Sequence, residues 1–168
     1  MPITFQQIAT GELGTVQTLQ IMRSLVLQSL RSPKLVKLAT SLWRGSNNDA
    51  MTVINRVDNY LRQYYIWKED EVNGQPMEAI QTPEWMIQGQ EMSGQFIGDC
   101  DDISTLEAAL LTAIGIPCRF VVIRSKPDTM VYDHVFVEAF TGREWVVSDI
   151  TVPRDTKHVY YQRLEINI

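Results

Sequence analysis

Hydrophobic and polar residues recur with a helical period along most of the first 66 residues. Apolar side chains at spacings of three and four predict helices over 15–31, from 33 to about 44, and from a 47–49 cap to about 65. Ser32 is a good helix-capping residue, Pro33 suits a first helical position, and Gly45 ends the second helix. These helices carry no cluster of reactive residues, so we expect them to form core and scaffold.

The pattern changes after residue 97, where one more helix is followed by strands. Apolar residues continue at helical spacing from Asp99 until Gly115 and Pro117 end the helix. Runs rich in Val, Ile and aromatic residues then predict strands over 119–124, 132–140, 145–151 and 158–168. The turn 141–144 joins the second and third strands as a hairpin. At 168 residues we expect one α+β domain, 1–168, with a helical lead-in over 1–66 and a second part over 67–168.

Residues 67–97 show weak periodicity and several turn signals. Asn73-Gly74 and Pro76 mark turns, and Thr82-Pro83 opens a short helix through about Gln88. A loop-rich stretch of this length is more often functional than accidental. It could wall a substrate groove with Trp67 or Trp85 as an apolar side, or both tryptophans could belong to the core.

Composition and charge narrow the function classes. A formal net charge of −5 argues against general nucleic-acid binding. Residues 1–66 carry seven Lys/Arg and three Asp/Glu, against eight and seventeen in 67–168, which indicates a basic helical surface beside an acidic one. No apolar run approaches the length of a membrane span, and we expect no signal peptide. We therefore expect a cytoplasmic protein of a bacterial host, or a virion-associated one.

Cys100 is the candidate nucleophile. The run Gly98-Asp99-Cys100 places this thiol in the first turn of the predicted helix, with Asp99 as N-cap. There the unpaired N–H groups and the helix dipole favour a thiolate. Its helix holds Cys100 about 20 Å from Cys118, too far for a disulfide. We expect two free thiols in a reducing compartment.

A cysteine nucleophile needs a base and a group that orients the base. The chain has two histidines, His134 and His158. If Phe140 pairs with Trp145 across the hairpin turn, His134 and Asp149 become diagonal neighbours on one face, within reach of each other. Glu138 lies on the same face. An ordinary cross-strand ion pair is the alternative, which the additional cysteine on a helix N-terminus makes the weaker one.

These residues resemble the transglutaminase-like cysteine-enzyme superfamily. The resemblance covers about 65–152, in four ordered motifs: Gly98-Asp99-Cys100, Gly115-Ile116-Pro117-Cys118-Arg119, His134-Val135-Phe136-Val137-Glu138, and Trp145 with Asp149-Ile150-Thr151. It implies a papain-like core, in which the cysteine-bearing helix packs on an antiparallel sheet. It also implies Cys100 as nucleophile, His134 as general base and acid, and Asp149 as the orienting group. Two departures are Cys118 for the family's Ala and Ile150 for its Pro.

The implied reaction is cysteine-dependent amide hydrolysis or acyl transfer through a thioester, as in a peptidase or amidase. The backbone N–H of Cys100 is expected to hold the oxyanion together with a second donor: Gln95, Gln90 or the indole of Trp85. We expect no cofactor and no metal; a metal held by Asp99, Asp101 and Asp102 is a minor alternative.

The lead-in and the Gly-Asp-Cys-Asp-Asp run resemble small bacteriophage and prophage members of this superfamily. The partners would then be a peptide or protein amide substrate and phage structural proteins, with neither nucleic acid nor membrane. The alternative is a virion or assembly protein that uses the fold for binding with little or no catalysis.

Overall fold

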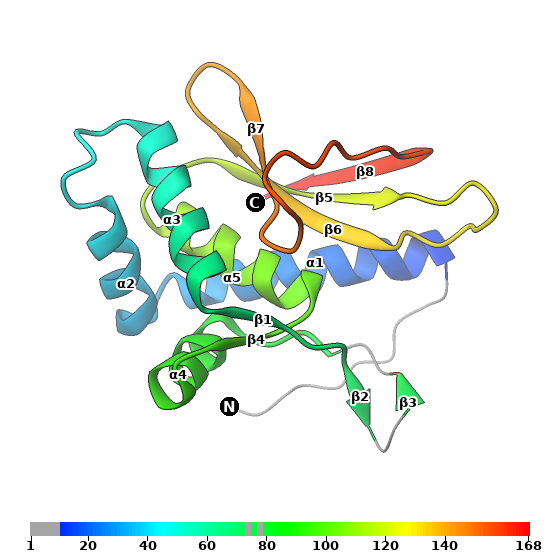
Figure 1. Ribbon diagram of the computed structural model, residues 1–168, viewed down its shortest axis with the longest axis horizontal. Helices are drawn as coiled ribbons and strands as arrows, with labels where there is room; N and C mark the ends of the chain where they lie inside the picture. Colours follow the sequence, from blue (N-terminus) through cyan, green and yellow to red (C-terminus); the bar gives the residue numbers. More distant parts are fainter. Residues whose placement is uncertain (1–10, 73–74, 77–78) are drawn as a thin grey trace.

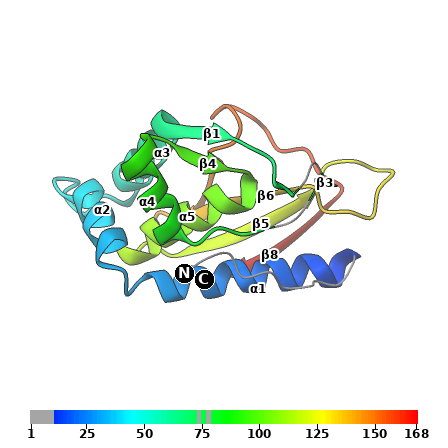
Figure 2. The same cartoon turned by 90° about the horizontal axis from the view of Figure 1, so that it is seen from below.

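The computed structural model describes residues 11–72, 75–76 and 79–168, which form a mixed helix and sheet fold (Figure 1). The helices are α1 (Gly11–Ser29), α2 (Pro33–Trp43), α3 (Ala50–Tyr64), α4 (Pro83–Ser93) and α5 (Cys100–Ala113). Helix α5 is central, because α1, α2, α3, α4 and β6 all contact it (Figure 2). None of the helices in these ranges has the length and apolar character that a membrane span requires.

The three predicted lead-in helices are present, with ends that differ by a few residues. The Asp49 carboxylate caps α3 by accepting from the Thr52 backbone N–H at 2.8 Å, as its residue type predicts. Ser32 occupies the N-cap of α2, but its side chain makes no capping hydrogen bond and donates to Glu84 at 3.1 Å instead. This contact ties the start of α2 to α4.

The segment 67–97 contains more regular structure than its pattern predicts. Helix α4 continues to Ser93, beyond the expected end near Gln88, because the first residue to break it is Gly94 in the left-handed region. Strand β1 (Tyr65–Trp67) pairs in parallel with β4 (Phe96–Gly98), and β2 (Glu71–Val72) pairs with β3 (Gln75–Pro76). The predicted turn at 73–74 lies outside the described residues. Trp67 and Trp85 are both about half exposed, so neither belongs to the core.

A four-stranded antiparallel sheet completes the fold, in the order β7–β6–β5–β8. Its strands are β5 (Cys118–Arg124), β6 (His134–Phe140), β7 (Trp145–Ser148) and β8 (Gln162–Asn167). Phe140 pairs with Trp145, the register that the hairpin predicts. Since β7 and β8 lie at opposite edges, the connection between them crosses the outer face of β6 (Figure 1).

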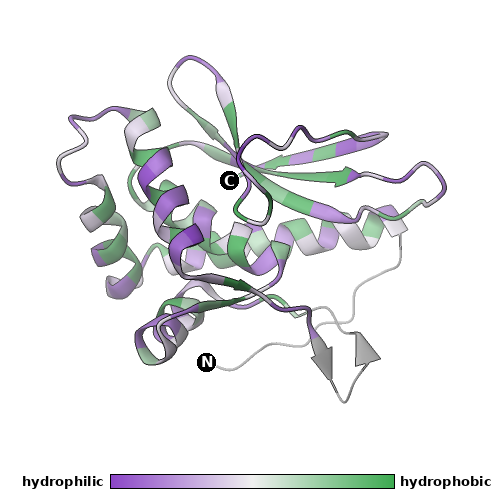
Figure 3. Cartoon of the chain, viewed as in Figure 1, coloured by the Kyte–Doolittle hydropathy of each residue, from purple (hydrophilic) through white to green (hydrophobic). Residues whose placement is uncertain are grey.

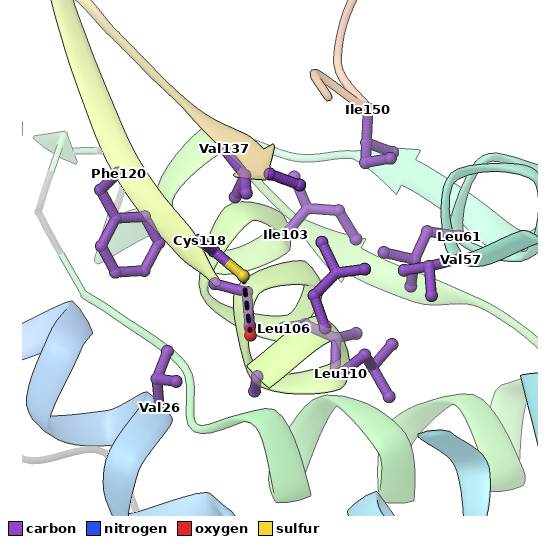
Figure 4. Packing of buried hydrophobic residues seen from close by; sticks show 14 of the residues in the cluster. Val26, Val57, Leu61, Ile103, Leu106, Leu110, Cys118, Phe120, Val137 and Ile150 are labelled. Atoms are coloured by element: carbon purple, nitrogen blue, oxygen red, sulfur yellow. Dashed lines mark hydrogen bonds between the residues drawn. The ribbon is translucent and has the colours of Figure 1, made fainter. Parts of the chain in front are cut away.

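The core lies between the helices and the inner face of this sheet. Every residue of α5 from 101 to 111 is buried, and hydrophobic residues line β5 and β6 (Figure 3). Leu106 and Leu110 pack with residues of α3 and of the sheet (Figure 4). At roughly 25 cal/mol per Å² of buried apolar surface, this packing is the main stabilising term. A helix buried on all sides holds its first residue, Cys100, in a fixed position.

Candidate active site

The backbone before α5 brings Cys100 to the start of a buried helix. Gly98 is required there, because a Cβ at this position would lie 2.4 Å from Asp102 Oδ2. Asp99 holds the N-cap position, but its carboxylate makes no capping hydrogen bond. The prediction that it caps the helix through its side chain is therefore wrong; instead, the Asp99 side chain helps line a cavity.

That cavity, of about 300 Å³, contains both Cys100 and His134. Asp99, Asp101 and Tyr132 also line it, together with residues of α1. Cys100 is partly buried, and His134 is 18% exposed. The two side chains are close enough for Cys100 to influence the pKa of His134. The predicted nucleophile and base therefore share one solvent-accessible cavity.

His134 is anchored by Asp149. Its Nε2 lies 2.6 Å from Asp149 Oδ2, so Nδ1 is the ring nitrogen left to face Cys100. The other Asp149 oxygen, Oδ1, accepts from the Thr151 backbone N–H at 3.0 Å and from its hydroxyl at 2.7 Å. The hairpin register predicts this pairing, and the structure brings the two side chains together.

The electrostatics of the pair favour a charged imidazole. Burial by itself would lower the pKa of His134, but hydrogen bonds to Asp149 and Cys100 outweigh it and raise that pKa to about 10. Burial would raise the pKa of Asp149, but the His134 and Thr151 contacts bring it below its usual value. A cationic imidazole beside a thiol stabilises the thiolate, which is the nucleophilic form.

Arg62 of α3 supports the segment that carries Asp149, a role that the sequence pattern did not reveal. Its guanidinium donates to the backbone carbonyls of Asp149, Ile150 (3.2 Å) and Val152 (2.5 Å). Its Nε also donates to the buried Asp58 at 2.9 Å. The i,i+4 spacing of Asp58 and Arg62 is the one signal in the sequence that points to this ion pair.

His158 also reaches the site, although the hairpin argument favours His134 alone. Its ring stacks on Phe136 at 4.4 Å between centroids, with 7° between the planes. Its Nε2 lies 3.1 Å from Asp149 Oδ2 but is not aligned for a hydrogen bond. Burial lowers the pKa of His158, so its ring is neutral at pH 7.

Tyr65 is a second residue that the pattern missed. Its hydroxyl donates to the Gly98 carbonyl at 3.2 Å. Burial raises the pKa of Tyr65, and the nearby Cys100 and Asp99 raise it further. The phenol therefore stays protonated and holds the backbone just before the nucleophile.

The predicted oxyanion donors lie away from this cavity. Trp85 and Gln90 are on α4, and Gln95 is exposed between α4 and β4. None of the three lines the cavity that contains Cys100 and His134. As the first residue of α5, Cys100 has a backbone N–H without an intrahelical acceptor, so it can serve as one donor. The second donor stays a prediction.

The remaining candidate residues have structural roles. Glu138 shares the face of His134, but it accepts from Arg119 at 2.8 Å and from Arg163 at 2.9 Å. Cys118 is buried, and burial raises its pKa to about 12. Neither side chain is placed for the chemistry of Cys100.

The acidic first turn of α5 is buried rather than solvated. Both Asp102 oxygens accept from Gln81, one from its backbone N–H and one from its side chain, each at 2.6 Å. Burial raises the pKa of Asp102 to about 7. Oxygens of Asp99, Asp101 and Asp102 lie within 4.8 Å of one another. Both Asp102 oxygens, however, already accept hydrogen bonds from Gln81.

Comparisons with known proteins find a matching family model and structures of similar fold. A family model described as the transglutaminase-like superfamily matches residues 36–150, a range that contains Cys100, His134 and Asp149. A candidate protease from Parabacteroides distasonis is 12% identical with a TM-score of 0.59, covering 79% of this chain and 26% of that one. A candidate cysteine protease from Cytophaga hutchinsonii is 22% identical with a TM-score of 0.52, covering 72% and 38%. The chain thus spans well under half of either structure. No curated protein sequence matches it.

Proposed function

Because the chain belongs to the transglutaminase-like superfamily, we propose that it is a cysteine-dependent amide hydrolase or acyltransferase that uses Cys100, His134 and Asp149. The observation that carries this proposal is the 2.6 Å contact between His134 Nε2 and Asp149 Oδ2, in a histidine that shares a cavity with Cys100. An isolated surface ion pair would have no thiol beside it and would contribute little to stability.

The first half of the proposed reaction forms a thioester. The Cys100 thiolate attacks the carbonyl carbon of an amide, and the resulting oxyanion accepts from the Cys100 backbone N–H and a second donor. As the C–N bond breaks, the His134 imidazolium gives its proton to the departing amine. Asp149 holds the ring in place and stabilises its positive charge.

The second half regenerates the thiolate. His134, now neutral, takes a proton from water or from an acceptor amine as that molecule attacks the thioester carbonyl. Collapse of the tetrahedral intermediate breaks the C–S bond and returns Cys100 as a thiolate beside the imidazolium. Water gives hydrolysis and an amine gives transfer, so the same three residues serve both outcomes.

Selective alkylation tests this proposal, with Cys118 as a control within the same chain. We expect iodoacetamide near neutral pH to modify Cys100 much faster than the buried Cys118, as located by mass spectrometry. His134→Ala should reduce labelling of Cys100 by at least about 10-fold, because the imidazolium that stabilises the thiolate is lost.

Equal, slow labelling of both cysteines would contradict the proposal. It would favour the alternative of a phage virion or assembly protein that uses the fold only for binding. Incorporation of a labelled amine into a glutamine peptide separates transfer from hydrolysis.

A further inference from the structure

Three ligand atoms of the kind that bind transition metals converge beside the cavity. One nitrogen from His134, one oxygen from Asp149 and one nitrogen from His158 all lie within 4.8 Å of one another. Asp149 Oδ2 is 2.6 Å from His134 Nε2 and 3.1 Å from His158 Nε2. The proposed reaction uses His134 and Asp149 but gives His158 no role.

His158 Nε2 is buried and has no hydrogen-bond partner among the described residues. A buried ring nitrogen without a partner is costly, and such a group needs a reason. The ring is held rigidly by its stacking on Phe136. In the tautomer that leaves Nε2 unprotonated, this nitrogen has a lone pair to offer a cation.

We propose that His134, Asp149 and His158 form a binding site for Zn²⁺ or a similar divalent transition-metal ion, and that the bound ion inhibits the enzyme. Two imidazoles and one carboxylate are a set that zinc prefers, at about 2.0–2.2 Å from each ligand atom. The two separations from Asp149 Oδ2 are shorter than those between ligands of a tetrahedral ion. We expect each of these two contacts to lengthen by less than about 1 Å on binding.

Inhibition follows from the protonation of the ring, and this consequence rests on the proposed function. A neutral imidazole that coordinates through Nε2 carries its proton on Nδ1. His134 in that state cannot accept a proton from Cys100, and it is no longer an imidazolium that stabilises the thiolate. The ion and the Nε2 proton therefore compete for one nitrogen.

The site has an approach that is separate from the cavity of Cys100. A second cavity, of about 210 Å³, is lined by Asp149 and His158. Arg62 and Arg154 also line it, but both form ion pairs with Asp58. This pairing offsets positive charge that would otherwise repel a cation.

Zinc binding is measured most cleanly in Cys100→Ser protein, where the thiolate cannot be a ligand. We expect metal-free Cys100→Ser protein to take one Zn²⁺ from a chromophoric chelator. Adding His158→Gln or Asp149→Asn should weaken that binding by at least about 100-fold, because each removes a ligand. Adding Asp155→Asn, an exposed acid on the same connection, is the matched control and should change nothing.

Three results would overturn the site. The first is the absence of detectable zinc binding in Cys100→Ser protein, which would place the ion on the thiolate. His158→Gln and His158→Ala, each checked for native circular dichroism, could both bind as tightly as their parent. Loss of binding in Asp99→Asn but not in His158→Gln would place the ion on the first turn of α5.

The inhibitory consequence is tested separately in protein that retains Cys100. Zinc should slow iodoacetamide labelling of Cys100, and His158→Gln should lose this sensitivity relative to its own metal-free rate. If Cys100 is unreactive without metal, the proposed function fails while the binding result stands. If Cys100 is reactive and zinc-bound protein labels at the same rate, the inhibition fails alone.

Discussion

At the scale of single residues, two histidines that lie near the same carboxylate have pKa values shifted in opposite directions. Asp149 Oδ2 lies near both rings, yet the pKa of His134 is raised to about 10 while that of His158 is lowered. Burial lowers the pKa of both rings, but only His134 has a hydrogen bond to Asp149 and a neighbouring thiol, Cys100, that together reverse this shift. At neutral pH the positive charge therefore resides on the ring beside Cys100, where it can support a thiolate.

Replacing His134 should destabilise the fold in a way that depends on pH. Its folded pKa of about 10 lies above the usual histidine value of 6.5, so its stabilisation is full below pH 6.5 and is lost as pH rises through 10. We expect His134→Gln to lower the free energy of unfolding by about 2–4 kcal/mol at pH 6 and by less at pH 9.5. Urea denaturation at both pH values measures this.

His158→Gln provides the opposite case. The folded pKa of His158 lies below the usual histidine value of 6.5, so wild-type protein should lose stability relative to this variant as pH falls below 6.5. Equal slopes for the two variants would show that Asp149 does not distinguish the rings.

At the scale of elements, the junction between β4 and α5 allows no side chain at residue 98. A methyl group there would lie 2.4 Å from Asp102 Oδ2, and that carboxylate is held by Gln81. We expect Gly98→Ala to destabilise the protein by about 1–3 kcal/mol and to slow labelling of Cys100, because the helix start must shift. Chemical denaturation and alkylation rates measure the two effects.

Gly89→Ala is the matched control for this substitution. Gly89 lies inside α4, and a Cβ there would meet nothing within 4 Å. Alanine should stabilise the helix by about 0.5–1 kcal/mol and leave labelling unchanged. The same response at both positions would contradict the close approach at Gly98.

Helix α3 carries two arginines that bind backbone carbonyls, one beside the candidate active site and one away from it. Arg62 holds the segment that follows β7. We expect Arg62→Met to lower the free energy of unfolding by about 2–4 kcal/mol and to reduce labelling of Cys100 through the loosened Asp149. Denaturation and alkylation report the two losses separately.

Arg56 makes the comparable contacts away from the site. It donates to the carbonyls of Leu42, Arg44 and Gly45 near the end of α2. Arg56→Met should therefore destabilise the protein with little effect on Cys100. If both variants reduced labelling in proportion to stability, Arg62 would have no positioning role.

The elements that could be predicted are those with strong local signals. Periodicity predicts α1, α2, α3 and α5, and the four-residue turn sets the β6–β7 register on which the His134–Asp149 pair depends. The three-residue strands β1 and β4 have too few positions to show a period. Their parallel pairing depends on contacts between residues about 30 positions apart, which a local pattern does not encode.

At the scale of the whole molecule, the site is assembled from segments far apart in the chain. Cys100 starts α5, His134 starts β6, Asp149 follows β7, and His158 comes from the connection that crosses the sheet. The sequence identifies the first three through a helix start and a hairpin. His158 and Tyr65 could not be placed because their positions follow only from tertiary packing.

The central place of α5 predicts that the lead-in and the second part of the chain unfold together. The surface of α5 is covered by α1, α2 and α3 on one hand and by β6 on the other, so neither group keeps a core without the other. Cys118 can report this joint unfolding, because its thiol is unreactive in the folded protein. It is 2% exposed, and burial raises its pKa to about 12. We expect its labelling in increasing urea to give the same free energy of opening as the global transition followed by circular dichroism.

Cys100 is the internal control, because it already lines the cavity and should label without any unfolding. A markedly smaller opening free energy at Cys118 would mean that the helical lead-in detaches first, and the chain would then be two folding units rather than one.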